Sequence, residues 1–174
     1  RLDDGRVTWY DLDLPDVMEL RQSLLKEEEQ RIHNLAASVF DSGWLEKIEH
    51  EGRPVLILLE GAAMYFSEQE MRSLFAALAE AFADASMLIE IMPPFLISQQ
   101  KRHDSVDTQK APFQWGVKSG KEIEKLHPAI TFLKERTLYE GFRCRWGLFG
   151  LLSVIPWWNK NCNDKIACLH FAGR

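Results

Sequence analysis

The chain has 174 residues, of which 46% are hydrophobic and 27% charged, and 26 acidic against 21 basic side chains give it a formal net charge of -5. This length suffices for one domain with a sizeable core, and the composition is ordinary for a globular protein. The acidic balance argues against a nucleic-acid partner, because phosphate neutralisation dominates such binding, and no apolar run approaches the roughly 20 residues of a membrane span.

The first elements alternate between predicted strand and predicted helix. Residues 6–13 are rich in aromatic and β-branched side chains and predict a strand. Residues 14–31 predict a helix, with Pro15 at its first position and acids in its first turn. A brief strand is predicted at 35–40, and a loop with a short helix at 41–52.

The next three elements carry the strongest signals in the chain. Residues 54–59, PVLILL, are apolar throughout and predict a strand buried on both faces, as in parallel sheets covered by helices. Residues 67–85 predict a helix that opens with a capping box formed by Ser67 and Glu70. Residues 86–93 predict another strand, and the alternation as a whole indicates a parallel α/β sheet with right-handed crossovers.

The second half of the chain is less regular. Residues 98–112 are polar without periodicity and predict a loop or a mobile helix. Further elements are predicted at 113–117 (strand), 118–129 (short helix), 130–142 (strand) and 164–173 (strand). No repeat, low-complexity segment or linker interrupts the chain, so residues 1–174 are predicted to be part of a single domain.

Cysteine and histidine usage bears on the setting of the protein. The three cysteines, Cys144, Cys162 and Cys168, contain no Cys-x-x-Cys pair, and the five histidines lack ligand spacing. Neither a disulfide framework nor a metal site is therefore predicted. Because the first five residues, RLDDG, are mostly charged and open no apolar run, no signal peptide is recognised, and we expect a reducing, cytoplasmic setting without a membrane partner.

Acidic residues close two of the predicted strands. Asp11 and Asp13 end the first strand, and Glu60 ends PVLILL. In open α/β sheets ligands bind beyond the carboxyl ends of the strands, where an acid can accept both hydroxyls of a ribose. Each acid taken alone is as well explained as a helix cap or a solvated turn residue. Together at one sheet edge they favour a nucleotide-type ligand.

Several stretches resemble a known family. Residues 7–22, 37–48 and 53–78, and later 113–130 and 139–156, are similar to the leucine carboxyl methyltransferase family. The similarity is to its bacterial branch of polyketide O-methyltransferases and covers nearly the whole chain. Its most specific elements are an Asp-Leu-Pro motif at residues 13–15 and a Glu-Gly-x-x-x-Tyr motif at residues 60–65.

The resemblance implies a Rossmann-like class I methyltransferase that uses S-adenosylmethionine. This is an α/β fold whose mostly parallel sheet carries helices on both faces. By the family's pattern Asp13 binds the ribose, Ser38, Val39 and Phe40 lie near the adenine, and Glu60 with Gly61 faces the methionine portion. Many members have an Asp where Ser38 stands, so one adenine hydrogen bond is in question.

The acceptor side is less defined by the resemblance. Tyr65, Phe95 and Trp115 are aromatic residues near predicted strand ends and are candidate contacts for a small-molecule acceptor, although core packing is the commoner fate of such residues. A hydroxyl acceptor needs a base to take its proton, whereas a carboxylate acceptor does not. No residue is assigned as that base, and His103 is more simply a surface histidine.

One departure from the family pattern is large. The family's glycine-rich first motif precedes the Asp-Leu-Pro strand, and this chain begins after that place. The chain is therefore expected to be truncated at its N-terminus, without the first strand and the N-terminal helices, and to expose the edges of two neighbouring strands. Trp157 and Trp158 are then candidates for pocket walls or for a homo-oligomer surface.

Three functions follow from these observations. The first is an O-methyltransferase that acts on a small-molecule hydroxyl or carboxylate. The second is an inactive methyltransferase remnant that serves as a binding or dimerisation module. The third is a dinucleotide-dependent oxidoreductase, which shares the strand-end acid and from which only the family resemblance separates the methyltransferase.

Overall fold

The computed structural model describes residues 5–25, 31–100 and 110–173. The chain forms two compact units, one ending at Glu51 and the other beginning at Gly52. We call them the N-terminal and the C-terminal unit and describe each by itself.

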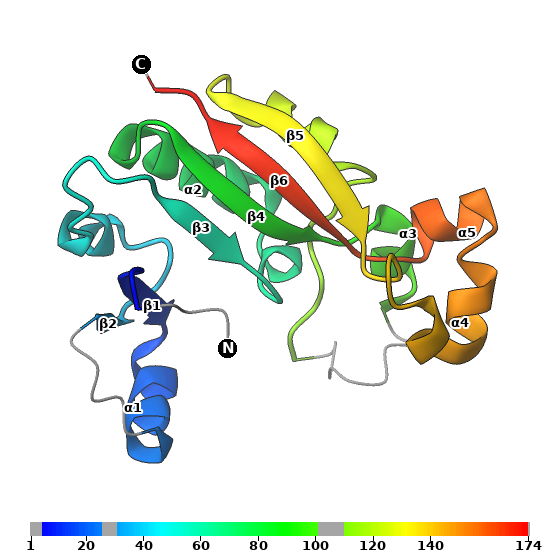
Figure 1. Ribbon diagram of the computed structural model, residues 1–174, viewed down its shortest axis with the longest axis horizontal. Helices are drawn as coiled ribbons and strands as arrows, with labels where there is room; N and C mark the ends of the chain where they lie inside the picture. Colours follow the sequence, from blue (N-terminus) through cyan, green and yellow to red (C-terminus); the bar gives the residue numbers. More distant parts are fainter. Residues whose placement is uncertain (1–4, 26–30, 101–109, 174) are drawn as a thin grey trace. The chain divides into compact units, whose positions relative to one another are not determined.

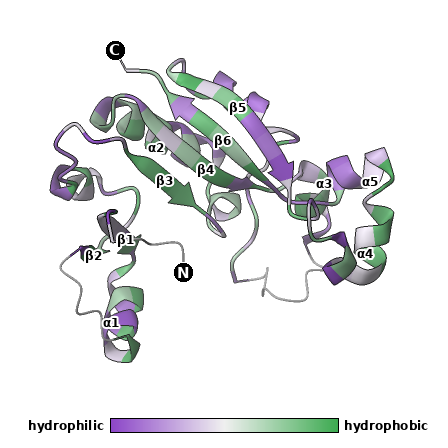
Figure 2. Cartoon of the chain, viewed as in Figure 1, coloured by the Kyte–Doolittle hydropathy of each residue, from purple (hydrophilic) through white to green (hydrophobic). Residues whose placement is uncertain are grey.

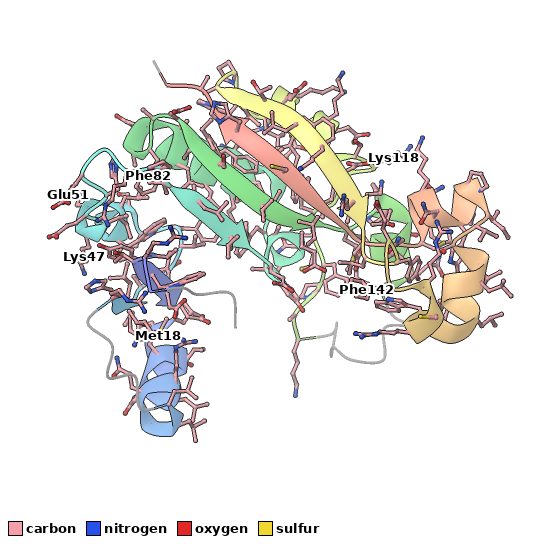
Figure 3. The ribbon with its side chains drawn as sticks, in the orientation of Figure 1. Met18, Lys47, Glu51, Phe82, Lys118 and Phe142 are labelled. Atoms are coloured by element: carbon pink, nitrogen blue, oxygen red, sulfur yellow. The ribbon has the colours of Figure 1, made fainter. Side chains whose placement is uncertain are left out.

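The N-terminal unit is a parallel strand pair with its connecting helix. It contains β1 (Trp9–Asp13), α1 (Pro15–Leu24), β2 (Ile32–Ala36) and the 3-10 helix η1 (Ser42–Lys47). β1 and β2 run parallel, with Trp9 opposite Ile32 and Asp13 opposite Ala36. Met18, labelled in Figure 3, is the buried residue of α1. The predicted strand–helix–strand order is confirmed, but β2 lies about four residues earlier than the predicted 35–40, because residues 38–40 form a turn instead of pairing with β1.

The C-terminal unit is built on a four-stranded sheet of order β3-β4-β6-β5 (Figure 1). β3 and β4 are parallel, as predicted, while β6 runs antiparallel to both of its neighbours. The elements are β3 (Leu56–Leu59), η2 (Ala63–Tyr65), α2 (Glu68–Ala81), β4 (Ala85–Ile91), α3 (Pro94–Ser98), η4 (Gly120–Lys125), β5 (Ile130–Thr137), η5 (Arg143–Trp146), α4 (Gly147–Leu152), α5 (Pro156–Asn161) and β6 (Lys165–Phe171).

One face of this sheet carries the core. Alternate residues of β4 and β6 are buried there, and α2 adds Met71, Leu74, Phe75 and Leu78. The rings of Phe75 and Phe171 lie 6.3 Å apart, which places α2 on the Phe171 face. The 3-10 helix η4 covers the same face, where a Cβ on Gly120 would meet the Cβ of Ala167 at 2.5 Å.

The start of α2 confirms the predicted capping box. The Ser67 hydroxyl accepts a hydrogen bond from the Glu70 backbone N–H at 3.2 Å, and the Glu70 carboxylate accepts one from the Ser67 N–H at 2.7 Å. The bond from the Ser67 backbone is the main cause that lowers the pKa of Glu70. Because both bonds satisfy N–H groups that the helix itself leaves unpaired, the cap anchors the residues that follow β3.

Removing this cap is expected to weaken the C-terminal unit. Ser67→Ala should lower the free energy of unfolding by about 1 kcal/mol, the usual contribution of an N-cap hydroxyl. Urea denaturation followed by circular dichroism measures it. Ser73→Ala, at an exposed position within the same helix, is the matched control and should be neutral or slightly stabilising. Equal effects of the two substitutions would contradict a capping role.

The opposite face of β3 differs from the prediction. Leu56 and Leu58 are 59% and 54% exposed, while Ile57 and Leu59 between them are partly buried. Burial on both faces is therefore wrong, because in the described part of the chain α2 and η4 cover the other side of the sheet. Figure 2 shows β3 as an almost wholly hydrophobic strand. In the described residues β3 pairs with β4 alone, and its second edge is open.

The segment 113–117 is also not the predicted strand. Gln114 and Trp115 both donate backbone hydrogen bonds to the Met64 carbonyl, at 2.7 and 3.3 Å, so the segment runs against η2 instead of joining the sheet. Gly116 permits a close approach to the residue that follows β4, because a Cβ there would lie 2.3 Å from the Met92 carbonyl oxygen. The predicted short helix at 118–129 appears as η4, and most of the polar segment 98–112 lies outside the described residues.

Among the described helices, none combines the length and the apolar character that crossing a membrane requires.

Candidate active site at the carboxyl edges of the parallel strands

The N-terminal unit brings four predicted cofactor residues to one strand edge. Asp13 is the last residue of β1, and Ser38, Val39 and Phe40 follow β2. Since the two strands are parallel and Asp13 lies opposite Ala36, their carboxyl ends coincide. The Ala37 N–H donates to the Asp13 carbonyl at 3.0 Å and extends the ladder by one bond.

The local bonds of these residues hold a tight turn. The Ser38 hydroxyl accepts from the Phe40 N–H at 3.3 Å, and the Trp44 indole donates to the Val39 carbonyl at 3.1 Å. Phe40 is 41% exposed, so the turn presents an apolar ring to solvent. A planar ligand ring has a suitable surface there.

The two acids of β1 have different partners. Asp11 forms an ion pair with Arg21 of α1, with 2.7 Å between Oδ2 and Nη2. Asp13 is exposed, and its Oδ1 accepts from the Leu14 N–H at 2.8 Å. The side chain of Asp11 therefore holds α1 against β1. Asp13 is the better candidate to bind a ligand at this strand edge.

The C-terminal unit places Glu60 and Gly61 at the carboxyl end of β3. Glu60 is exposed, and Gly61 takes a left-handed backbone with φ of 68°, a conformation that glycine adopts without strain. The Gly61 N–H donates to the Glu90 carboxylate of β4 at 2.8 Å. This bond joins the ends of the two parallel strands.

The three predicted acceptor residues lie in different surroundings. Tyr65 is partly buried, and its ring lies 5.3 Å from that of Phe113. Phe95 of α3 is 40% exposed and packs edge to face on Trp157 of α5, with 5.4 Å between centroids. Trp115 is only 5% exposed and belongs to the packed interior.

Sequence reasoning missed a carboxyl pair near the same edge. Burial, followed by the charge of Glu90, raises the pKa of Asp164 to about 7. The Tyr139 hydroxyl donates to the Cys162 carbonyl at 3.3 Å, and burial raises the pKa of that phenol. Glu90 could have been recognised in the sequence, because it is the one acid inside the apolar strand 86–93. Asp164 could not, because nothing in the sequence distinguishes it from other acids in turns.

Two further points from the sequence concern a base and a metal site. His103, considered as a base, lies outside the described residues. Within the described ranges no group of three or more His, Cys, Asp or Glu residues is arranged to hold a metal ion.

Comparison with known proteins identifies relatives. The chain is similar to the tetracenomycin polyketide synthesis O-methyltransferase TcmP of Streptomyces glaucescens, with 25% identity over 134 residues that cover 77% of this chain and 49% of that protein. It is also similar to the S-adenosyl-L-methionine-dependent methyltransferase dpfgK of Gibberella zeae, with 29% identity over 174 residues that cover 90% of this chain and 57% of that protein. No family model matches the chain.

The fold is likewise that of known methyltransferases. The N-methyltransferase NodS of Bradyrhizobium japonicum, solved with S-adenosyl-L-homocysteine, matches with a TM-score of 0.52 and 9% identity over 93% of this chain and 65% of that one. The predicted Rossmann-like methyltransferase fold and the resemblance to S-adenosylmethionine-dependent methyltransferases are thus confirmed. The chain spans about half the length of the two curated relatives.

Proposed function

We propose that the protein containing this chain transfers a methyl group from S-adenosylmethionine to an oxygen atom of a small molecule. The observation that carries the proposal is the similarity to two methyltransferases, one of them an O-methyltransferase, over 77% and 90% of the chain. The strand-end acids support it, since Asp13 and Glu60 each lie at the carboxyl end of a parallel strand, and open α/β sheets bind ligands at such ends. In this proposal residues 1–174 are one portion of a methyltransferase domain.

The cofactor roles follow the residues at the two strand edges. Asp13 would accept hydrogen bonds from the ribose hydroxyls, because its carboxylate is exposed at the end of β1. Ser38, Val39 and Phe40 would contact the adenine, for which the exposed Phe40 ring offers a stacking surface. Glu60 and Gly61 would face the methionine portion. When bound, the cofactor supplies an activated methyl carbon, so the protein's task is chiefly to align the acceptor.

The acceptor is proposed to be a small molecule with a hydroxyl or a carboxylate. Phe95 supports this assignment best, since it is exposed and lies with Trp157 beyond the carboxyl end of β4. Tyr65 and Trp115 remain candidate contacts, although the depth of Trp115 restricts its access to a ligand. The free cysteines support a reducing, cytoplasmic setting.

A second candidate function is a non-enzymatic binding or dimerisation module. The exposed Leu56 and Leu58 on an open-edged strand favour it, because such a surface accepts a partner. Homo-oligomer formation belongs to this alternative. A dinucleotide-dependent oxidoreductase is disfavoured, since both relatives are methyltransferases.

The test is calorimetric titration of the complete gene product with S-adenosylmethionine. We expect one site per chain, and Asp13→Asn should weaken it about tenfold or more, because hydrogen bonds to a charged group contribute about 1.5–3 kcal/mol. Asp16→Asn, at an exposed position in the first turn of α1, is the matched control and should bind as the unchanged protein does. Absence of binding, or equal affinities for the two variants, contradicts the proposal.

A further inference from the structure

Asp164 lies where the sheet places it beside Glu90. β6 runs antiparallel to β4, with Ile166 opposite Glu90 and Lys165 opposite Ile91. The turn residue Asp164 therefore precedes β6 at the carboxyl end of β4, and its carbonyl accepts from the Leu138 N–H at 3.0 Å. The backbone of Asp164 is thus held between β5 and β6, close enough to Glu90 for the two charges to interact.

The carboxyl group of Asp164 is largely withdrawn from solvent, and one of its two oxygens has no hydrogen-bond partner among the described residues. Its Oδ1 has almost no contact with solvent and finds no hydrogen-bond partner within the part of the chain that the structure describes. The charge that acts on it is the carboxylate of Glu90, which repels it. A buried, unpaired carboxyl destabilises a fold, and such groups are concentrated at functional sites.

Glu90 connects Asp164 to the proposed cofactor site. Its Oε2 accepts from the N–H of Gly61, the residue proposed above to face the methionine portion. Phe95 and Trp157, the exposed aromatic pair, come from α3, which follows β4, and α5, which shortly precedes Asp164. Figure 1 shows α3, α4 and α5 gathered beyond the same end of the sheet. Asp164 therefore lies at the same end of the sheet as Glu90, which holds Gly61, and as α3 and α5, which carry the proposed acceptor surface.

We propose that the Asp164 carboxylate takes the proton of a hydroxyl acceptor, an inference that rests on the methyltransferase function proposed above. Glu90 is then a positioning residue, which holds Gly61 in place through its hydrogen bond. As the acceptor O–H bond breaks, its proton goes to Asp164 and the oxygen lone pair forms a bond to the methyl carbon. The carbon–sulfur bond breaks at the same time, and its electron pair stays on sulfur. The products are a methyl ether, a neutral thioether and the protonated Asp164.

The charges around Asp164 suit this role. A group that titrates near neutral pH combines a usable ionised fraction with a strong drive to accept a proton. The titratable groups whose charges interact with it are Glu90 on β4 and Tyr139 after β5, and Tyr139 in turn interacts with Cys162 before β6. Lys165, the adjacent cation, is directed elsewhere and pairs with Glu135. No cation therefore competes for the Asp164 carboxylate in these contacts.

The test compares two ligands that differ by the sulfonium charge. The affinities of the complete gene product for S-adenosylmethionine and S-adenosylhomocysteine are measured by calorimetry from pH 5.5 to 8.5. An opposite charge within about 4–6 Å lowers a carboxyl pKa by about 1–3 units. S-adenosylmethionine should therefore bind about tenfold tighter or more at the alkaline end, while the affinity for S-adenosylhomocysteine changes less than about twofold.

Two variants separate the possible outcomes. Asp164→Asn should abolish the difference in pH dependence and retain binding of both ligands. Asp84→Asn, the same substitution at the opposite edge of the sheet before β4, should keep the difference. If the two ligands show the same pH dependence in the unchanged protein, Asp164 does not face the methyl group and the inference is wrong. If neither ligand binds at any pH, the proposed function itself fails.

Discussion

Asp164→Asn is expected to raise the free energy of unfolding by about 2–4 kcal/mol at pH 8.5 and to leave it almost unchanged at pH 4. The folded protein raises the pKa of this carboxyl from 3.8 to about 7, mainly by burial and secondarily through Glu90. Between these two values the folded state binds a proton that the unfolded chain has released. Stability therefore falls as the pH rises through this window.

The asparagine removes this penalty because it has nearly the same shape and carries no charge. Urea denaturation at several pH values measures the difference between the variant and the unchanged protein. Asp84→Asn serves as the control, because the Asp84 carboxylate is 87% exposed and pairs with His170 at the surface. A gain in stability that is the same at pH 4 and pH 8.5 would contradict the assignment. A gain that grows between pH 4 and pH 7 and levels off above pH 7, together with the expected loss of sulfonium sensing, would show that stability is sacrificed for function.

Glu135→Gln is expected to lower the free energy of unfolding by about 3 kcal/mol, because it leaves a buried cation without its counter-charge. The Lys165 side chain is 5% exposed, and its Nζ lies 3.5 Å from Glu135 Oε1. Its other partner is the backbone carbonyl of Lys118, a residue labelled in Figure 3. The second Glu135 oxygen accepts from the Ser119 hydroxyl and the Gly120 N–H, at 2.9 and 2.8 Å.

An amide at position 135 can still accept the bonds from Ser119 and Gly120, so the expected loss isolates the charge. The double variant Glu135→Gln with Lys165→Met should regain part of the stability, since it removes the uncompensated cation. Glu140→Gln is the matched control, because the ion pair of Glu140 with Arg136 is exposed and 3.8 Å long, and it should cost less than about 1 kcal/mol. Equal losses for the two glutamine variants would show that the Lys165 pair is not a buried ion pair in solution.

The most accurate predictions from the sequence concerned features that depend on residues close together in the chain. The capping box of α2 is an example, because Ser67 and Glu70 are three residues apart and their bonds form within one turn. The strand-end acids are another, since Asp13 is the last residue of β1 and Glu60 directly follows β3. That β1 and β2 are parallel, and so bring Asp13 near Ser38, followed from the helix between them.

Predictions of burial failed where they depended on what packs against an element. The apolar run of β3 indicated a strand covered on both faces, yet Leu56 and Leu58 are more than half exposed. An apolar side chain favours burial, but whether it is buried depends on another element being present to cover it. The segment 113–117 has the composition of a strand, but its Gln114 and Trp115 N–H groups bond to the Met64 carbonyl. A segment can join a sheet only where a neighbouring strand offers an unpaired edge, and the composition of the segment does not reveal whether such an edge is available.

The sequence by itself therefore determined the alternation of strands and helices from β1 to β4, the cap of α2 and the acids at the strand ends, because each follows from local spacing. Only the tertiary structure decided that β6 inserts antiparallel beside β4 and brings Asp164 to Glu90. The same pairing of β6 with β5 brings Lys165 to Glu135. Desolvation and the field of neighbouring charges depend on residues distant in the chain, and these forces set the proton affinity of Asp164.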